Sequence, residues 1–149
     1  MSEIELREMN MFDIGDVLEI EDDLTSGSGW TDTGLLTYLM RNDTVFLIAE
    51  ENGETVGYAG LLMVPFEGDI LNIAVRKDKR RSGIATKLME KLLHEASFNG
   101  VTDVHLEVRE SNAAALGLYK KFGFAEDGIR KNYYTEPVEN AITMTLRQG

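Results

Sequence analysis

The sequence predicts an α/β (or α+β) fold, with one domain built on a mixed sheet. The chain has 149 residues, 43% of them hydrophobic, which suits a single domain with its own core. Helices are predicted early, followed by a hairpin, then strand–helix–strand–helix, then strands, and this order favours a mixed sheet. No repeat or low-complexity linker interrupts the chain. We therefore expect residues 1–149 to fold as one domain.

The first half of the chain predicts a strand, two helices and a hairpin. Residues 4–9, "IELREM", alternate between apolar and polar types and predict a strand, whereas residues 12–24 carry apolar side chains at helical spacing. Asp32 is a candidate N-cap for a second helix that runs through Arg41. Two strand-like runs flank Asn52-Gly53, a dipeptide typical of hairpin turns.

The second half predicts strands separated by helices. "DILNIAV" is a short apolar strand, and "DVHLEVR" alternates cleanly. "SNAAALGLYKKFG" predicts a helix, with Ser111 as a candidate N-cap and Gly123 as a candidate C′ residue. The predicted elements are strand 69–75, helix 84–96, strand 103–109, helix 111–123 and strands 128–134 and 141–146.

Composition excludes several kinds of site. The chain has no cysteine, so it has neither a disulfide framework nor a thiolate nucleophile. Its two histidines, His94 and His105, fall on different predicted elements, and we expect no metal. The start, "MSEIELREMNMFD", is acidic and lacks the apolar region of a secretory signal, and no apolar run reaches transmembrane length. We expect a cytoplasmic protein without a membrane partner.

The charge of the chain is unevenly distributed. The net charge is −11, with −12 carried by residues 1–60 and +5 by residues 76–91. An acidic body argues against a nucleic-acid binder, which normally presents a broad basic face. It suits a cationic partner, because complementary fields speed encounter, although solubility alone would also explain it.

Residues 76–91 form a basic island in this acidic chain. The island contains the stretch "KRRSGIAT", which follows an apolar strand and begins a helix. A helix N-terminus presents unpaired N–H groups and a partial positive charge, so this layout suits an anion such as phosphate. Gly83 and Ala85 leave room for close approach, and Arg80 and Arg81 add charge. The spacings of P-loops and dinucleotide-binding loops are absent. From this loop alone, an anion cradle and a solvated connection are equally supported.

Three segments together resemble one enzyme family. "NIAVRKDKRRSGIATKLM" is similar to the acetyl-CoA-binding segment of the GNAT superfamily of N-acetyltransferases, whose Gln/Arg-x-x-Gly-x-Gly/Ala pattern is met by Arg80, Gly83 and Ala85. "LEVRESNAAALGLYKKFGF" resembles the next strand and helix of that superfamily. Together with "IRKNYY", it is similar to the bacterial ribosomal-protein-alanine N-acetyltransferases. The resemblance runs from Asn72 to Met144 and is weaker before that segment.

The resemblance implies a GNAT-type fold: a mixed, mostly antiparallel sheet with helices on both faces. Its two central strands, 69–75 and 103–109, would splay apart with the help of a bulge and admit acetyl-CoA, the expected co-substrate. The positions that the resemblance assigns to acetyl-CoA are Ile73, Ala74 and Val75 for the pantetheine arm, Arg80, Arg81, Ser82, Gly83, Ile84, Ala85 and Thr86 for the pyrophosphate, and Asn112 for the cofactor arm. By position alone, Asn112 is more often a local cap or turn residue.

The resemblance assigns catalysis to two residues. Glu107 matches the general-base position of the family and Tyr119 its general-acid position. Without the resemblance, Glu107 would be taken for a solvated carboxylate or a partner of Arg109, and Tyr119 for a packed aromatic at helical spacing from Phe122. Direct attack of an amine on the thioester needs no protein nucleophile, which agrees with the absence of cysteine.

The acceptor side is less well defined. Tyr133 and Tyr134 are strand aromatics, of which the resemblance suggests that at least one lines the acceptor-peptide groove. Trp30 follows "SGSG" in a region that shapes the acceptor site in the family. Gly29 stands where the family has a proline, so the loop should be less constrained.

The resemblance therefore implies transfer of an acetyl group from acetyl-CoA to a protein N-terminus, by family the N-terminal alanine of a small-subunit ribosomal protein. A basic protein N-terminus is the expected partner, without direct nucleic-acid contact. Two alternatives remain open at this point. One is a GNAT acetyltransferase that acts on another N-terminus, a lysine or a small amine, and the other is a non-catalytic acyl-CoA-binding module.

Overall fold

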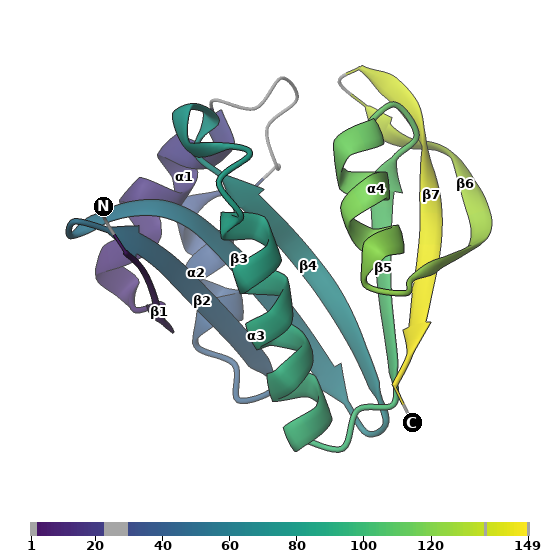
Figure 1. The fold of residues 1–149 in the computed structure, drawn as a ribbon, viewed down its shortest axis with the longest axis horizontal. Helices are drawn as coiled ribbons and strands as arrows, with labels where there is room; N and C mark the ends of the chain where they lie inside the picture. Colours follow the sequence, from purple (N-terminus) through teal and green to yellow (C-terminus); the bar gives the residue numbers. More distant parts are fainter. Residues whose placement is uncertain (1–2, 23–29, 136, 149) are drawn as a thin grey trace. The chain divides into compact units, whose positions relative to one another are not determined.

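The computed structural model describes residues 3–22, 30–135 and 137–148 (Figure 1). Strands and helices appear wherever the sequence predicts them within these ranges, in the order β1 (Ile4–Glu8), η1 (Met11–Asp13), α1 (Ile14–Asp22), α2 (Asp32–Leu39), β2 (Thr44–Glu51), β3 (Glu54–Val64), β4 (Glu67–Val75), η2 (Lys77–Lys79), α3 (Ile84–Phe98), β5 (Asp103–Arg109), α4 (Ala113–Lys121), β6 (Ala125–Thr135) and β7 (Val138–Arg147). No helix in the described ranges is long and apolar enough to cross a membrane.

The strands form a seven-stranded mixed sheet in the order β1-β2-β3-β4-β5-β7-β6. Strand β1 pairs antiparallel with β2, β2 with β3, β5 with β7 and β7 with β6, whereas β4 and β5 run parallel. The β4–β5 ladder consists of three pairs, Glu67↔Asp103, Gly68↔Val104 and Asp69↔His105. The predicted α/β class with a mixed, mostly antiparallel sheet is confirmed.

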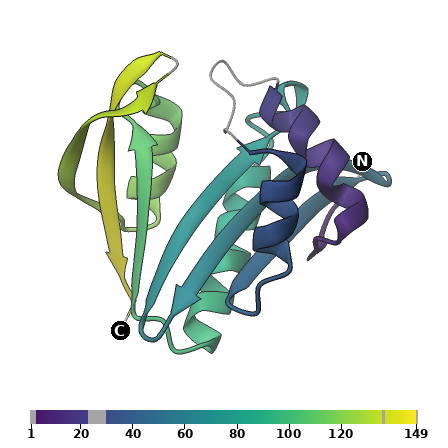
Figure 2. The same cartoon turned by 180° about the vertical axis from the view of Figure 1, so that it is seen from behind.

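The chain divides into two compact units, and the first comprises Met1–Leu62 and Ile70–Glu95. In this unit α3 lies on one face of the strands and α1 and α2 lie on the other (Figures 1 and 2). The apolar face of α1 packs with α2 and the strands around a buried cluster. Its fully or almost fully buried members are Met9, Val17, Ile20, Leu35, Phe46, Ile48, Tyr58 and Ala74.

The second unit comprises Met63–Asp69 and Ala96–Gly149. Helix α4 covers one face of its strands β5, β7 and β6 (Figures 1 and 2). The alternation predicted for β5 is confirmed, because Val104, Leu106 and Val108 are buried whereas the residues between them are half-buried. Since neighbouring side chains of a strand point to opposite faces, the polar residues 103, 105, 107 and 109 share one face.

Two predicted helix caps are wrong. Thr31, not Asp32, caps α2, because its extended backbone lets Oγ1 accept from the Gly34 N–H at 3.0 Å. Asn112, not Ser111, caps α4, and its Oδ1 accepts from the Ala115 N–H at 3.1 Å. In both cases adjacent residues have similar capping propensity, so backbone angles decide which one becomes the cap. Gly123 does follow the C-cap of α4, with a φ of 99°.

Candidate functional site

One candidate site is the loop between β4 and α3 in the first unit, which contains residues 80–86. Helix α3 begins at Ile84, and the Lys87 N–H donates to the Gly83 carbonyl at 3.1 Å. The N–H groups of Ile84, Ala85 and Thr86 therefore precede the first hydrogen bond of the helix and have no intrahelical acceptor. Together with the partial positive charge of the helix end, these donors suit an anionic group.

The backbone of this loop is shaped for close approach. Arg81 has a φ of 66° and Gly83 a φ of 83°, so two nearby residues adopt the left-handed region, which is uncommon for arginine. Turns of this kind gather N–H groups into a concave anion-binding surface. A Cβ added to Gly83 would meet no protein atom within 4 Å, so the concave side is open. The residues present therefore fit a phosphate-bearing ligand.

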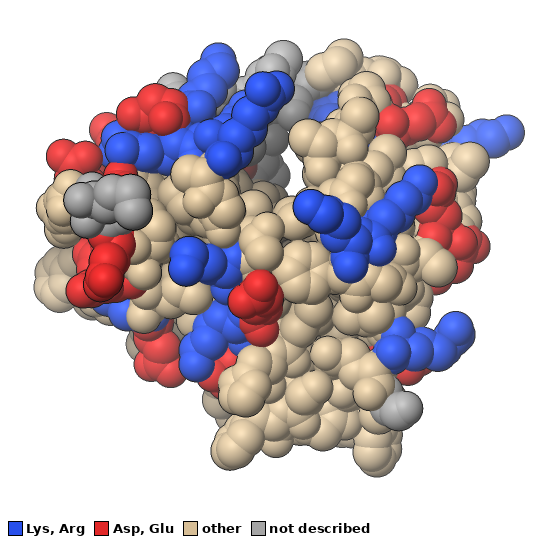
Figure 3. Space-filling view, viewed as in Figure 1, with Lys and Arg blue, Asp and Glu red and all other residues tan. Residues whose placement is uncertain are grey.

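Only part of the basic island is neutralised within the protein. Arg76 pairs with Asp78 at 2.7 Å and with Glu54 at 3.2 Å, and Lys79 pairs with Glu51 at 2.5 Å. Arg80 and Arg81 are exposed and belong to none of the ion pairs among the described residues. Figure 3 shows lysine and arginine side chains gathered over this loop and the start of α3. The loop thus keeps two formal charges for an anion.

Strand β4 presents alternate backbone groups to its two sides. The Arg76 N–H donates to the Val56 carbonyl at 2.7 Å, and the Ala74 carbonyl oxygen lies 3.0 Å from where a Cβ on Gly57 would stand. Residues 74 and 76 therefore direct their backbone toward β3. By the alternation of a strand, the backbone groups of Ile73 and Val75 point to the opposite side.

A buried carboxylate supports this strand. Glu21, at the end of α1, is 2% exposed, and its Oε1 accepts from the side-chain amide of Asn72 at 2.5 Å. Asn72 in turn accepts from the Ile73 N–H at 2.9 Å. Glu21 was not predicted as a buried residue from the sequence, because Glu21 lies in an acidic helix and resembles a solvated residue.

Trp30 lies beside the same network. Tyr58 donates its hydroxyl proton to Glu21 and is hydrogen-bonded by Trp30. Burial, and then the charge of Glu21, raises the pKa of Tyr58. The Trp30 ring packs edge-on against Tyr38 with 5.2 Å between centroids. Trp30 is thus half-buried at the edge of the core, and Gly29, which precedes it, lies outside the described residues.

A second candidate site lies on the polar face of β5, in the second unit. Glu107 is half-buried, opposite Thr143 of β7, and its Oε1 lies 3.8 Å from the Arg130 guanidinium. Its charge also raises the pKa of Tyr134, after the larger effect of burial, to about 12. The predicted base is therefore close to one of the two predicted acceptor-site tyrosines.

Tyr119 points into the second unit from α4 and is 6% exposed. Its ring centroid lies 5.9 Å from that of Phe124. Burial raises the pKa of Tyr119, and interaction with Tyr134 raises it further. Tyr134 thus interacts electrostatically with both predicted catalytic residues, Glu107 and Tyr119.

Arg109 packs against one of the two tyrosines, Tyr134, a contact that was not predicted from the sequence. Its guanidinium lies 4.2 Å from the Tyr134 ring centroid and 3.2 Å from the carboxylate of Glu139. Glu139 also accepts from the Ser111 N–H, just before the Asn112 cap. Tyr133 packs edge-on against Tyr134 with 5.1 Å between centroids. The alternation of β5 places Arg109 on the same face as Glu107. This pattern is the sequence signal that could have indicated the contact of Arg109 with Tyr134.

Comparisons with known proteins place the chain among acetyltransferases. Residues 14–124 match the family model described as "Acetyltransferase (GNAT) family". A protein of Bacillus subtilis named "Putative ribosomal protein bS18-alanine N-acetyltransferase" is 36% identical over 140 residues, which are 93% of this chain and 92% of that protein. The ribosomal protein bS18-alanine N-acetyltransferase of Escherichia coli is 44% identical over 98 residues, 64% of this chain and 66% of that one.

The fold agrees with that relationship. The crystal structure of the ribosomal-protein-S18-alanine N-acetyltransferase from Escherichia coli superposes with a TM-score of 0.90 at 32% identity, and the alignment covers 99% of this chain and 95% of that chain. The resemblance noted in the second half of the sequence therefore extends over almost the whole chain.

Proposed function

Because this chain belongs to the acetyltransferase (GNAT) family, whose members use acetyl-CoA, we propose that it transfers an acetyl group from acetyl-CoA to the N-terminal α-amine of a protein. The proposed acceptor is the N-terminal alanine of a small-subunit ribosomal protein. The observation that carries this proposal is the likeness over nearly the full chain to relatives named for that activity on ribosomal protein bS18. We also propose that residues 1–149 act as one domain.

The residues proposed to hold the pantetheine arm and the pyrophosphate of acetyl-CoA, 73–75 and 80–86, belong to the first unit. The N–H groups of residues 84–86 and the charges of Arg80 and Arg81 hold the pyrophosphate. The three-pair β4–β5 ladder does not include Ile73, Ala74 or Val75, which supports their pairing with the pantetheine arm. The direction of the Ile73 and Val75 backbone, away from β3, supports this pairing, in which the Ile73 carbonyl takes part because the Ile73 N–H already donates to Asn72. Asn112 contributes through its side-chain amide, in addition to capping α4.

Glu107 serves as the general base. Acetyl-CoA supplies an activated acetyl group, and the amine must lose a proton to attack it. An α-amine has a pKa of about 8, whereas that of a lysine is about 10.4, so roughly a tenth of α-amines are already neutral near pH 7. A single half-buried carboxylate, acting directly or through a water, suffices for that task.

Tyr119 serves as the general acid toward the departing thiolate. Its burial holds the proton on the phenol more firmly than in water, while a thiol has a pKa of about 8.5. Complete transfer of the proton is therefore uphill, and the hydroxyl acts chiefly by donating a hydrogen bond to the developing negative charge. The stabilisation is largest in a water-excluded setting, which the 6% exposure of Tyr119 supports.

The acceptor side combines aromatic contacts with charge. Trp30 is the candidate acceptor-binding residue of the first unit, Tyr133 and Tyr134 are those of the second, and Arg109 holds Tyr134 in place. The acidic body of the chain, with a net charge of −11, attracts a basic ribosomal protein. A cytoplasmic location follows from that substrate class, and no nucleic acid or membrane needs to take part.

An intact-mass assay tests the proposal. The full chain is incubated with acetyl-CoA and a peptide that begins with alanine and has the basic composition of a ribosomal protein terminus. We expect one added acetyl group, and none on a control peptide whose only amine is a lysine side chain. Acetylation of the lysine peptide alone would assign the acceptor to another class of amine. Binding of acetyl-CoA without turnover of any peptide or small amine would indicate a non-catalytic acyl-CoA-binding module.

A further inference from the structure

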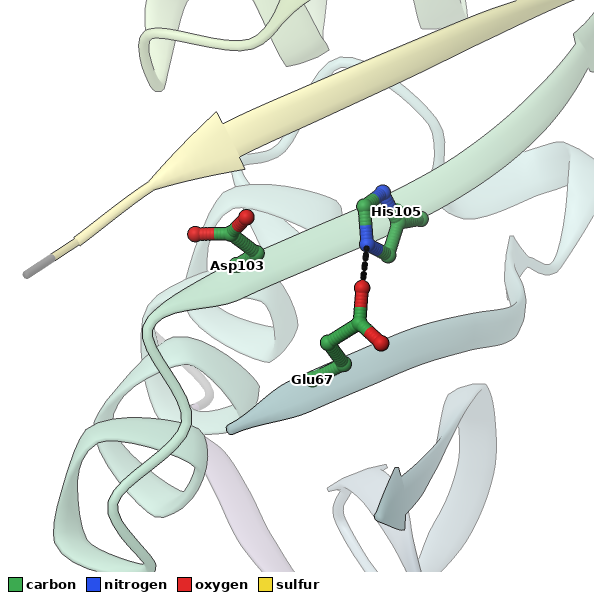
Figure 4. Close-up of side chains that lie close together, drawn as sticks. All are labelled: Glu67, Asp103 and His105. Carbon is green, nitrogen blue, oxygen red and sulfur yellow. Dashed lines mark hydrogen bonds and ion pairs between the residues drawn. The ribbon is translucent and has the colours of Figure 1, made fainter. Parts of the chain in front are cut away.

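Three side chains with metal-binding donors meet on one face of the second unit. Glu67 and Asp103 are paired residues of the parallel strands β4 and β5, and His105 lies two residues further along β5 on the same face (Figure 4). One donor atom of each residue lies within 4.8 Å of the other two. The His105 Nε2 atom is 3.1 Å from Glu67 Oε1.

The other ring nitrogen of His105, Nδ1, is hydrogen-bonded to the hydroxyl of Thr145. That hydroxyl cannot donate to His105, because its proton is already donated elsewhere. Thr143 donates to one oxygen of Asp127 at 2.6 Å, and Thr145 donates to the other. An ionised aspartate accepts hydrogen bonds only, so each threonine must give its single hydroxyl proton to Asp127. The Thr145 oxygen can therefore only accept from the His105 Nδ1 atom, which lies 2.9 Å away.

This arrangement determines the tautomer of His105. Because Nδ1 must carry a proton to donate to Thr145, the neutral imidazole has its lone pair on Nε2. That lone pair faces a carboxylate oxygen of Glu67 at 3.1 Å. Two acceptors at hydrogen-bonding distance repel each other unless a proton or a metal cation lies between them, and in the imidazolium form Nε2 would donate to Glu67.

We propose that Glu67, Asp103 and His105 form a binding site for a divalent transition-metal ion of the zinc type. One imidazole and two carboxylates are a ligand set that Zn²⁺ accepts, at ligand distances of about 2.0–2.2 Å. A ligating histidine that donates its other ring N–H to a fixed partner is the usual outer-shell arrangement, and Thr145, held by Asp127, supplies it here. The paired strands hold the backbones of Asp103 and Glu67 side by side, and the two side chains rotate to close the site on the ion.

The surrounding charge favours a cation. Asp69, which pairs with His105 in the β4–β5 register, lies on the same face, and Asp127 adds a further negative charge behind Thr145. The nearest arginine, Arg147, approaches Asp103 only to 3.9 Å, and its side chain is 82% exposed. It can therefore move aside at little cost. The sequence expectation of no metal considered histidines alone and did not count carboxylates from a neighbouring strand.

Zinc titration of the full chain, freed of metal by a chelator, tests the proposal. We expect one Zn²⁺ per chain by calorimetry, and at least tenfold weaker binding for His105→Gln and for Glu67→Gln. His94→Gln is the matched control, since it removes the other histidine, which is exposed on α3, and we expect unchanged binding. Thr145→Val removes only the partner of Nδ1, and we expect binding about 10–100-fold weaker.

A ¹⁵N spectrum of the imidazole provides the second readout. We expect His105 to carry its proton on Nδ1, and its Nε2 resonance alone to shift strongly when Zn²⁺ is added. Absence of stoichiometric binding, equal binding by wild type and His105→Gln, or an Nε2–H tautomer would each overturn the proposal. A response of Nε2 to acid but not to Zn²⁺ would mean that the site holds only a proton, and would equally overturn it.

Discussion

The side-chain amide of Asn72 donates a hydrogen bond to the buried carboxylate of Glu21 at 2.5 Å, although 51 residues separate the two in the sequence. The same asparagine accepts from the Ile73 N–H, so the end of α1 is connected through one side chain to the strand proposed to bind the donor. Tyr58 is the second partner of the carboxylate. A buried charge of this kind is stable only with such partners.

The first prediction concerns this contact. Asn72→Ala removes a donor from a buried carboxylate, and we expect it to lower the free energy of unfolding by about 2 kcal/mol, measured by urea denaturation. In a Glu21→Gln background, Asn72→Ala should lower the free energy of unfolding clearly less, because the carboxylate charge is absent. Equal costs in both backgrounds would show that the two residues are not coupled.

The second prediction concerns the pH dependence of stability. Arg7 donates to both oxygens of Asp13 at 2.7 and 2.8 Å, and these hydrogen bonds hold the pKa of Asp13 below its usual value. Because the folded pKa is lowered, the stabilisation is complete above the unfolded pKa of about 3.9 and is lost as the pH falls through the folded value. Asp13→Asn should therefore lower stability at pH 7 by about 2 kcal/mol and flatten its decline below pH 4.

Asp43→Asn is the control for that experiment. Asp43 makes a similar bidentate contact with Arg41, but its side chain is 30% exposed, against 8% for that of Asp13. A solvated pair contributes little, so we expect a smaller change in stability than for Asp13, which is 6% exposed. Equal changes for the two variants would refute the role assigned to burial.

The third prediction concerns catalysis. Tyr119→Phe retains the packing of the ring against Phe124 and removes the hydroxyl. We expect kcat to fall by about 10²-fold or more, with little change in the affinity for acetyl-CoA. Tyr38→Phe, which retains the ring contact with Trp30, should leave kcat unchanged. Undiminished kcat for Tyr119→Phe would exclude it as the acid.

The fourth prediction concerns the glycine of the donor loop. A Cβ at Gly83 would meet no protein atom, so the cost of Gly83→Val comes from its φ of 83° and from the space needed by the anion, not from crowding within the protein. We expect weaker binding of acetyl-CoA by calorimetry. Gly100→Val is matched, with a φ of 78° and equally open space, and should lose similar stability without losing affinity. Loss of affinity in both variants would point to general destabilisation.

The fifth prediction concerns the two arginines without ion-pair partners among the described residues. Arg80→Gln and Arg81→Gln should each weaken acetyl-CoA binding by about fivefold at low salt, and less at high salt, because exposed charges are screened. Lys77→Gln removes a charge from the same island but not from residues 80–86, and it should have little effect. A salt-independent loss would argue against an electrostatic role.

Local patterns predicted the elements well because their causes are local. Alternation set the bounds of β5, and Asn52-Gly53 forms the predicted turn, with φ values of 52° and 78°. Caps were less predictable. Thr31 caps α2 instead of Asp32, and Asn112 caps α4 instead of Ser111, because capping depends on the backbone angles of one residue. For residues 80–86 the loop alone supported an anion cradle and a solvated connection equally, and the assignment to the pyrophosphate, which came from the resemblance, stays a prediction.

The sequence by itself determined the order of strands and helices and the family, and it indicated the loop proposed to bind acetyl-CoA, since these depend on spacing within short segments. Only the tertiary structure decided which acidic residues are buried, paired or gathered. Glu21 and Asp13 look like members of a solvated acidic half, yet both are buried against specific partners. The parallel pairing of β4 and β5 brings Glu67 and His105 together. Because the two residues are 38 positions apart in the sequence, no local pattern predicts this register.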